Sequence, residues 1–262
     1  MKKLVIQVIA VAMTIGNLSI GVVAAQELPR REDLPSALFA KGTTTGKLLD
    51  RAYKLDTKAC FHVGRGFLQG GDGFPRNSSI AVAWLRSNAC QDSYAAKLLL
   101  GNVYLRGMGV AKDELAAFEI FDSLARRGDA PAMFILAGLY ADGVGTPRNP
   151  QEAFEQYTRA SLLGSVEALA RAARYYEDGL VVPKDTEFAR KLYERAIAES
   201  ANNFFASWRL GRMYLYGISV QKDLRKAKEL LQGASNWFPD AKTDLDIATC
   251  ELGEKPCGQK NK

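Results

Sequence analysis

The sequence predicts an all-α protein: a right-handed α-solenoid of about five helical hairpins with capping helices, in a chain of 262 residues. The main observation is a segment of about 36 residues that recurs five times, a period typical of stacked helical repeats. In each copy an aromatic residue stands three positions before a glycine, and an alanine eleven positions before it. The glycines are Gly70, Gly107, Gly143, Gly179 and Gly217, the aromatic residues Phe67, Tyr104, Tyr140, Tyr176 and Tyr214, and the alanines Ala59, Ala96, Ala132, Ala168 and Ala206.

Each recurring glycine is predicted to end the first helix of a hairpin, because glycine adopts the left-handed C-cap conformation at little cost. A short loop follows and ends at an Asn or Asp, whose side chain can accept from the free N–H groups of the next helix. Four residues later an alanine recurs, and four beyond it a bulky residue, so both lie on one face of the second helix. The caps are Asn77, Asp113, Asn149, Asp185 and Asp223, the alanines Ala81, Ala117, Ala153, Ala189 and Ala227, and the bulky residues Leu85, Phe121, Tyr157, Tyr193 and Leu231.

A small residue also recurs in the middle of each first helix, where it lets neighbouring backbones approach closely. These residues are Gly64, Gly101, Ala137, Ala173 and Gly211. The glycines in the segment LGNVYLRGMGVAKDELAAFEIF therefore have two roles. The first permits contact between helices, and the next two turn the chain before the second helix begins.

The pattern from Leu100 to Phe121 resembles the Sel1-like repeat, a relative of the tetratricopeptide repeat with a longer loop. The resemblance covers residues 56–238 and implies a repeat solenoid with a concave protein-binding surface. Proteins of this kind in bacterial envelopes act as adaptors in signalling, in polysaccharide export, in flagellar stator assembly and in neutralising secreted effectors. The first copy departs from the pattern by one extra loop residue, and the fourth and fifth lack the second glycine, at Val181 and Ser219.

Residues 1–25 have the features of a signal peptide. Lys2 and Lys3 precede an apolar run from Leu4 to Val23, and Ala24 and Ala25 provide the small residues that signal peptidase requires. Cleavage would start the mature chain near Gln26 and predicts a periplasmic or secreted protein without a membrane span. The alternative is a retained anchor, since about 20 apolar residues can cross a bilayer.

The mature chain divides into a leader with a capping helix (26–55), the solenoid (56–238), and a closing helix with a tail (239–262). Residues 26–41 are expected to be a flexible leader, residues 44–54 a capping helix and residues 240–249 the closing helix. Loss of Lys2 and Lys3 leaves 33 basic and 29 acidic residues, a net charge of +4. This charge is too small to indicate nucleic-acid binding.

The four cysteines of an exported chain indicate disulfides, for which we predict Cys60–Cys90 and Cys250–Cys257. Cys60 lies ten residues before the end of the first helix, and Cys90 about twelve after the start of the second. In an antiparallel hairpin these positions face each other to within roughly 3 Å along the axis, at 1.5 Å per residue. The alternative for the first pair is two buried free thiols.

The sequence gives little indication of a catalytic, cofactor or metal site. The one histidine, His62, lies two residues from Cys60, about 200° around a helix, so the two cannot form a local dyad. No ligand spacing typical of a metal site occurs, and the short Gly-x-Gly segments belong to the repeat.

The predicted binding surface is a stripe on the first helix of each hairpin, at positions two before, one after and five after the small residue. In order its members are His62, Arg65, Gln69, Leu99, Asn102, Arg106, Ile135, Gly138, Asp142, Arg171, Arg174, Asp178, Arg209, Arg212 and Tyr216. The partner-binding candidates are Arg65, Arg171, Arg174, Trp208, Arg209, Arg212 and Tyr216, since arginine and aromatic residues are enriched at interaction hot spots. They suit a protein partner with an acidic segment. The alternative is a solvated face whose arginines pair with Glu177 or Asp178.

The preferred hypothesis is therefore a non-catalytic periplasmic scaffold, adaptor or regulator that binds another protein. An immunity protein that neutralises a secreted toxin is the alternative, and an envelope hydrolase is a third hypothesis, weakened because a nucleophile–base pair is missing.

Overall fold

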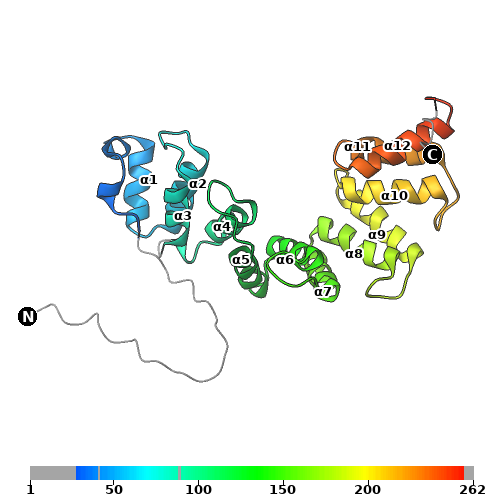
Figure 1. Cartoon of the computed structure of the whole chain (residues 1–262), viewed down its shortest axis with the longest axis horizontal. Helices are drawn as coiled ribbons and strands as arrows, with labels where there is room; N and C mark the ends of the chain where they lie inside the picture. The colour runs from blue at the N-terminus through cyan, green and yellow to red at the C-terminus, as the bar shows by residue number, and fades with distance from the viewer. Residues whose placement is uncertain (1–27, 41, 88–89, 257–262) are drawn as a thin grey trace, which may run out of the picture.

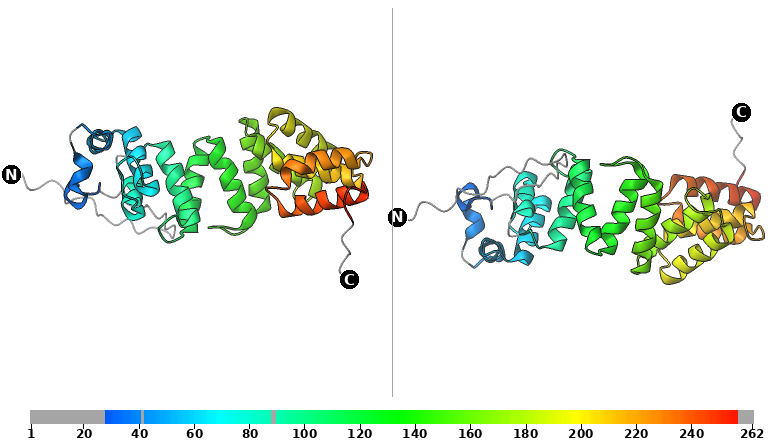
Figure 2. Two further views of the ribbon diagram at one scale, coloured as in Figure 1. Left: turned by 90° about the horizontal axis from the view of Figure 1, so that it is seen from above. Right: turned by 90° about the horizontal axis from the view of Figure 1, so that it is seen from below.

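The computed structural model describes residues 28–40, 42–87 and 90–256. The predicted signal peptide, residues 1–25, lies outside the described residues. Figure 1 shows the helices following one another along an open arc, with α6, α7 and α8 in its middle, and Figure 2 shows how elongated the molecule is.

Within the described residues the chain forms twelve α-helices and no strand, and the predicted α-solenoid is confirmed. Five antiparallel hairpins follow a capping helix and precede a closing one. The helices are α1 (Thr44–Tyr53), α2 (Thr57–Gln69), α3 (Ser78–Arg86), α4 (Tyr94–Arg106), α5 (Glu114–Arg126), α6 (Ala130–Asp142), α7 (Pro150–Leu162), α8 (Val166–Asp178), α9 (Thr186–Glu199), α10 (Phe204–Tyr216), α11 (Leu224–Ala234) and α12 (Pro239–Glu251).

The five predicted N-caps of the second helices are all present. Asn77, Asp113, Asn149, Asp185 and Asp223 each accept a hydrogen bond from a backbone N–H in the first turn of the helix that follows. These bonds satisfy donors that the helix itself leaves free, and they fix where each second helix begins.

Four of the five recurring glycines have the predicted left-handed C-cap conformation. Gly107, Gly143, Gly179 and Gly217 have φ between 62° and 73° and ψ between 31° and 44°. Gly70 has φ 76° and ψ 176°, so the prediction of a left-handed cap is wrong there. The longer loop after Gly70 contains an isolated β-bridge between Gly71 and Phe74. The Phe74 ring packs against the Phe67 ring, with 5.0 Å between the ring centres.

The mid-helix glycines stand where side chains of the partner helix leave no room for a Cβ. A Cβ at Gly101 would lie 2.8 Å from the Phe121 ring, and one at Gly211 would lie 2.8 Å from Leu231. Each contact joins the two helices of one hairpin. The recurring glycine and the recurring bulky residue are therefore one packing unit.

Both ends of the solenoid are covered. Helices α1 and α12 form as predicted, and Ala241 and Ala248 of α12 are buried. The expectation of a flexible leader is wrong for residues 28–40, which form two 3-10 turns and bury Leu34 and Leu38. These leucines join the core of the first hairpin, because a terminal repeat has no other neighbour to cover its apolar face.

A disulfide joins Cys60 of α2 to Cys90, with 5.6 Å between their Cα atoms. Cys90 is not on the second helix, as the sequence argument assumed, because α3 ends at Arg86. The hydroxyl of Ser87 donates to the carbonyl of Trp84 at that end, and the chain turns back toward α2. The second predicted pair includes Cys257, which lies outside the described residues.

Candidate binding pocket

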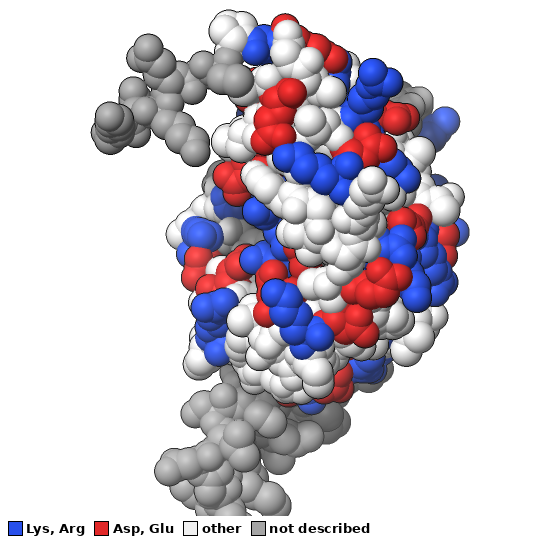
Figure 3. All heavy atoms as spheres, turned by 90° about the vertical axis from the view of Figure 1, so that its right-hand side faces the viewer, with Lys and Arg blue, Asp and Glu red and all other residues white. Residues whose placement is uncertain are grey.

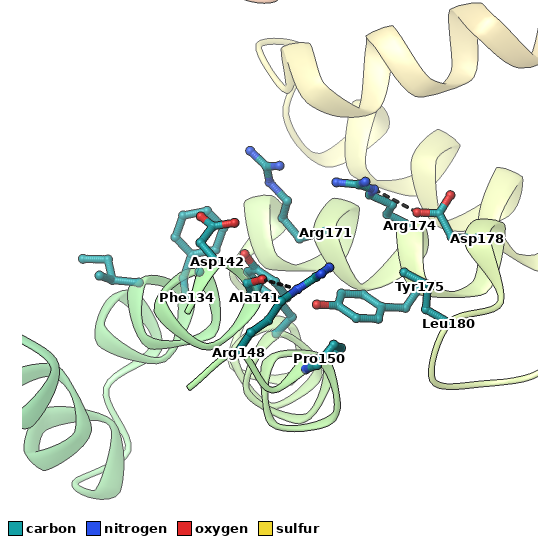
Figure 4. A pocket seen from close by; sticks show the side chains of 13 residues that line it. Phe134, Ala141, Asp142, Arg148, Pro150, Arg171, Arg174, Tyr175, Asp178 and Leu180 are labelled. Atoms are coloured by element: carbon teal, nitrogen blue, oxygen red, sulfur yellow. Dashed lines mark hydrogen bonds and ion pairs between the residues drawn. The ribbon is translucent and has the colours of Figure 1, made fainter. Parts of the chain in front are cut away.

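A pocket of about 420 Å³ lies between α6, α7 and α8, in the middle of the arc. We call it the central pocket. Six of its lining residues belong to the predicted stripe, and they come from the third and fourth hairpins. They are Ile135, Gly138, Asp142, Arg171, Arg174 and Asp178. Figure 4 shows Arg171 and Arg174 projecting from the same side of α8.

Gly138 helps to make the hollow. The equivalent positions in the other hairpins carry Arg65, Asn102, Arg174 and Arg212. A Cβ at Gly138 would meet only the hydroxyl of Tyr157, at 3.7 Å, which is ordinary van der Waals contact. This glycine is therefore not required by close helix packing, and its missing side chain leaves space for another molecule.

Arg171 enters the pocket without an ion pair to any described residue. Its guanidinium carbon lies 3.9 Å from the centre of the Phe205 ring, a cation–π contact. The side chain is half-buried, and this burial lowers the pKa of Arg171 from its ordinary value. The guanidinium stays charged, since arginine is not deprotonated in proteins. A half-buried cation of this kind favours an anionic group beside it.

The other two arginines of the pocket have partners within the chain. Arg174 Nε donates to Asp178 Oδ2 at 3.0 Å, one turn along α8. Arg148 Nε donates to the carbonyl of Ala141 at 3.0 Å. Figure 4 draws both bonds. Each arginine keeps further N–H groups for a ligand, because a guanidinium has five.

Two tyrosines that the sequence argument did not assign to the site also line the pocket. Tyr157 is 7% exposed and Tyr175 is 9% exposed, and neither hydroxyl hydrogen-bonds to another described residue. Burial raises the pKa of Tyr157 to about 12, so it is a neutral donor at physiological pH. Tyr157 could have been found from the sequence, as a hydroxylated member of the bulky column.

Arg209 does not lie on an open surface, contrary to the expectation from the stripe. It is 7% exposed, and its Nη2 lies 2.6 Å from Glu177 Oε1 and 3.4 Å from Asp178 Oδ1. The hydroxyl of Tyr193 donates to the same Glu177 carboxylate at 2.8 Å. The alternative interpretation, in which arginines pair with Glu177 or Asp178, describes Arg209 and Arg174.

Trp208, Arg212 and Tyr216 converge on Asp244 of the closing helix. Trp208 Nε1 donates to Asp244 Oδ2 at 2.9 Å, and the Tyr216 hydroxyl donates to Oδ1 at 3.1 Å. Arg212 Nε lies 3.3 Å from Asp244 Oδ2, a charge contact without hydrogen-bond geometry. Helix α12 thus occupies the part of the predicted binding surface that belongs to the fifth hairpin.

Arg65 is far along the chain from the central pocket, on the exposed side of α2. Its Nη2 lies 3.3 Å from His62 Nδ1, and its guanidinium lies 5.4 Å from the centre of the Phe61 ring. The structure therefore brings Arg171 and Arg174 together and leaves Arg65 apart from them.

The described residues contain no cluster of three His, Cys, Asp or Glu side chains that could hold a metal ion. The sulfur of Cys60 is bonded to Cys90, so it is not available as a nucleophile near His62. Among the same residues no helix has the length and apolar character needed to cross a bilayer. Figure 3 shows basic and acidic side chains interspersed over the C-terminal end of the molecule.

Solved structures give two useful comparisons. A Sel1 repeat protein from Oxalobacter formigenes is 26% identical and has a TM-score of 0.65, over 82% of this chain and 93% of its own. A protective antigen of uropathogenic Escherichia coli with an SLR fold is 23% identical, with a TM-score of 0.66. That match covers 80% of this chain but 45% of the antigen, so this chain spans less than half of the antigen's length. No curated protein matches the chain.

The profile of the Sel1 repeat matches five consecutive segments, residues 57–93, 95–129, 130–165, 166–200 and 205–236. The first four segments correspond to the first four hairpins, from α2–α3 to α8–α9, and the fifth corresponds to α10 and α11. Matched segments cover more than half of the sequence. The chain therefore belongs to the Sel1 repeat family.

Proposed function

We propose that the protein is a non-catalytic scaffold of the bacterial envelope that binds another protein through the inner surface of its arc. Sel1 repeat proteins generally mediate protein–protein interaction. The observation that carries the proposal is the central pocket. Arg171 lines it without an ion pair to a described residue, and two buried tyrosines, Tyr157 and Tyr175, line it without a hydrogen bond from their hydroxyls to a described residue. Arginine and tyrosine are the residue types that dominate binding energy at protein interfaces.

The envelope location rests on two observations. The Cys60–Cys90 disulfide suits an oxidising compartment such as the periplasm. The sequence of residues 1–25 has the charge and apolar pattern of a signal peptide.

The binding residues we propose are Arg171 and Arg174 at the centre of the surface, with Arg65 as a separate contact on α2. Trp208, Arg212 and Tyr216 would contact a partner only at their outer edges, since Asp244 occupies their polar groups. Arg209 belongs to the interior and supports α8 rather than the partner.

The test is site-specific photo-crosslinking in the native host. A photoreactive phenylalanine analogue replaces Ile135, which lines the pocket, and in a matched strain Glu155, which is exposed on α7. We expect one protein to be crosslinked from position 135 and not from position 155. Changing Arg171 and Arg174 to Ser in the Ile135 strain should abolish that product. No specific product from position 135, or the same products from both positions, would contradict a concave protein-binding surface.

A further inference from the structure

The fourth and fifth hairpins meet around a carboxylate that belongs to the chain itself. Glu177 of α8 accepts a hydrogen bond from the Tyr193 hydroxyl at 2.8 Å and one from Arg209 Nε at 2.8 Å. Tyr193 and Arg209 are both buried. The three side chains come from three successive helices, α8, α9 and α10. A tyrosine and an arginine thus form a receptor for one carboxylate between two hairpins.

The tyrosine and the arginine of this receptor recur one hairpin earlier, at the central pocket. Relative to the recurring glycines, Tyr157 stands where Tyr193 stands, and Arg171 stands where Arg209 stands. Ala141 stands where Glu177 stands. The third and fourth hairpins therefore have the tyrosine and the arginine, but a methyl group in place of the carboxylate.

The two earlier junctions lack this chemistry. Their equivalent residues are all apolar: Leu68, Leu85 and Leu99 between the first and second hairpins, and Leu105, Phe121 and Ile135 between the second and third. The tyrosine–arginine pair without its own glutamate occurs at one junction of the five hairpins, and that junction is where the central pocket lies.

We propose that Tyr157 and Arg171 bind the carboxylate of a glutamate side chain that a partner protein inserts into the central pocket. The proposal rests on the function proposed above and names the group that the surface recognises. Glutamate is the occupant we expect because Glu177 fills the sister site with the same two donors. Charge-assisted hydrogen bonds from an arginine to a carboxylate are among the strongest polar contacts that proteins make.

Charge and space at the pocket agree with an anionic guest. Its lining contains Arg148, Arg171 and Arg174 against Asp142 and Asp178, an excess of one positive charge. Asp142 does not take the place of the guest, since it forms no ion pair with Arg171 within 4 Å, whereas its counterpart Asp178 lies 3.4 Å from Arg209. Gly138 leaves the space beside the Tyr157 hydroxyl open.

The experiment is an NMR titration of the full mature chain with a pentapeptide that has one glutamate between alanines, blocked at both ends. The matched probe has glutamine in its place, and a third, pentaalanine with a free carboxyl end, presents a terminal carboxylate. We expect saturable shifts of the Arg171 Hε and Tyr157 ring signals with the glutamate peptide, with a Kd of about 1 mM, and none with glutamine. Equal shifts with the glutamine peptide, shifts only with the free carboxyl end, or no shifts would overturn the proposal.

Variants then separate the site from the general surface. Ala141→Glu gives the chain its own carboxylate at the pocket. It should therefore raise the melting temperature and lower the affinity for the glutamate peptide at least about tenfold. Tyr157→Phe keeps the ring and removes the hydroxyl donor, so it should also weaken binding of the glutamate peptide. This variant provides the test if Ala141→Glu does not fold. Tyr193→Phe changes the sister site alone and should leave peptide binding unchanged. If neither Ala141→Glu nor Tyr157→Phe weakens peptide binding, the proposed receptor is wrong.

The two proposals fail in different ways. If the Ile135 crosslink forms but is insensitive to Ala141→Glu, the scaffold function stands and the glutamate receptor is rejected. If the peptide binds as expected but no protein is crosslinked from Ile135, the receptor stands and the protein-binding function is rejected.

Discussion

The guanidinium of Arg209 on α10 lies 2.6 Å from the carboxylate of Glu177 on α8, and both side chains are nearly inaccessible to solvent. This pair is one of several polar contacts between the fourth and fifth hairpins. The Asn203 amide also donates to the carbonyl of Val166, and the hydroxyls of Thr186 and Ser219 are hydrogen-bonded. Burial lowers the pKa of Arg209, but the surrounding acidic partners outweigh burial and the pKa is raised. The charged form is thus the one that the fold favours.

Removing Arg209 should therefore be costly. In Arg209→Ala the Glu177 carboxylate stays buried with Tyr193 as its remaining donor, and we expect the free energy of unfolding to fall by about 3 kcal/mol. Urea denaturation followed by circular dichroism measures the change.

The matched control is the double variant Arg209→Leu with Glu177→Leu, which removes both charges. It should recover much of the loss, because the penalty arises from the unpaired charge. A single variant that costs less than about 1 kcal/mol would show that water reaches Glu177 and that the pair is not a buried one.

Stability should fall at alkaline pH through the buried tyrosines. The pKa of Tyr157 is raised by burial to about 12, above its value of about 10 in the unfolded chain. The unfolded state therefore loses this proton first, so the contribution of Tyr157 is fully present below about pH 10 and is lost as pH rises toward 12.

Tyr157→Phe tests this relation, because phenylalanine has no proton to lose. Between about pH 8 and pH 11 the wild type should lose about 1 kcal/mol more stability than the variant. Urea midpoints at several pH values measure the difference. Parallel pH profiles would mean that the Tyr157 hydroxyl ionises as it does in water.

The caps make separate contributions to the second helices. Asp113 Oδ1 accepts from the N–H of Ala116 at 2.9 Å at the start of α5. Asp113→Ala should lower the free energy of unfolding by about 1 kcal/mol, while Asp113→Asn should cost a few tenths. Glu119→Ala, an exposed change in the middle of α5, is the control and should be nearly neutral. Equal effects at the two positions would rule out a capping role.

The disulfide should account for a large share of the stability of the first hairpin. Replacing Cys60 and Cys90 by Ala opens a loop of 30 residues, and chain entropy predicts a loss of up to about 3.6 kcal/mol. The comparison is the melting temperature of the double variant and of the wild type, with and without reductant. The wild type in reductant should behave like the variant, and a wild type insensitive to reductant would contradict this prediction.

The repeat itself could be predicted in detail because each of its signals is local. A glycine C-cap, an Asn or Asp N-cap and a small residue opposite a bulky one depend on neighbours at fixed spacings. Gly101 with Phe121 and Asp113 with Ala116 are two such pairs. The prediction failed at Gly70, where a longer loop lets Phe74 fold back and changes the cap.

The site was predicted only in part, because side-chain pairing between hairpins depends on the superhelical twist. Arg171 and Arg174, which the stripe predicts to share a face of α8, both line the central pocket. It could not show that Arg209 turns inward, since the exposed and buried edges of the stripe have the same spacing. Asp244 was missed, although its position between Ala241 and Ala248 on α12 places a carboxylate on the buried face and indicates a polar partner.

The two ends of the arc are secured by different kinds of bond. The first hairpin is closed by a covalent bond between Cys60 and Cys90, whereas the last is held to α12 by a buried apolar cluster and by polar contacts to Asp244. In a solenoid each repeat is stabilised by its own contacts and by its nearest neighbours, so an end that is held only by non-covalent contacts can open without the rest of the chain. A protease acting on the folded protein would accordingly release C-terminal fragments first, and the hairpin with the disulfide would be the last to be degraded.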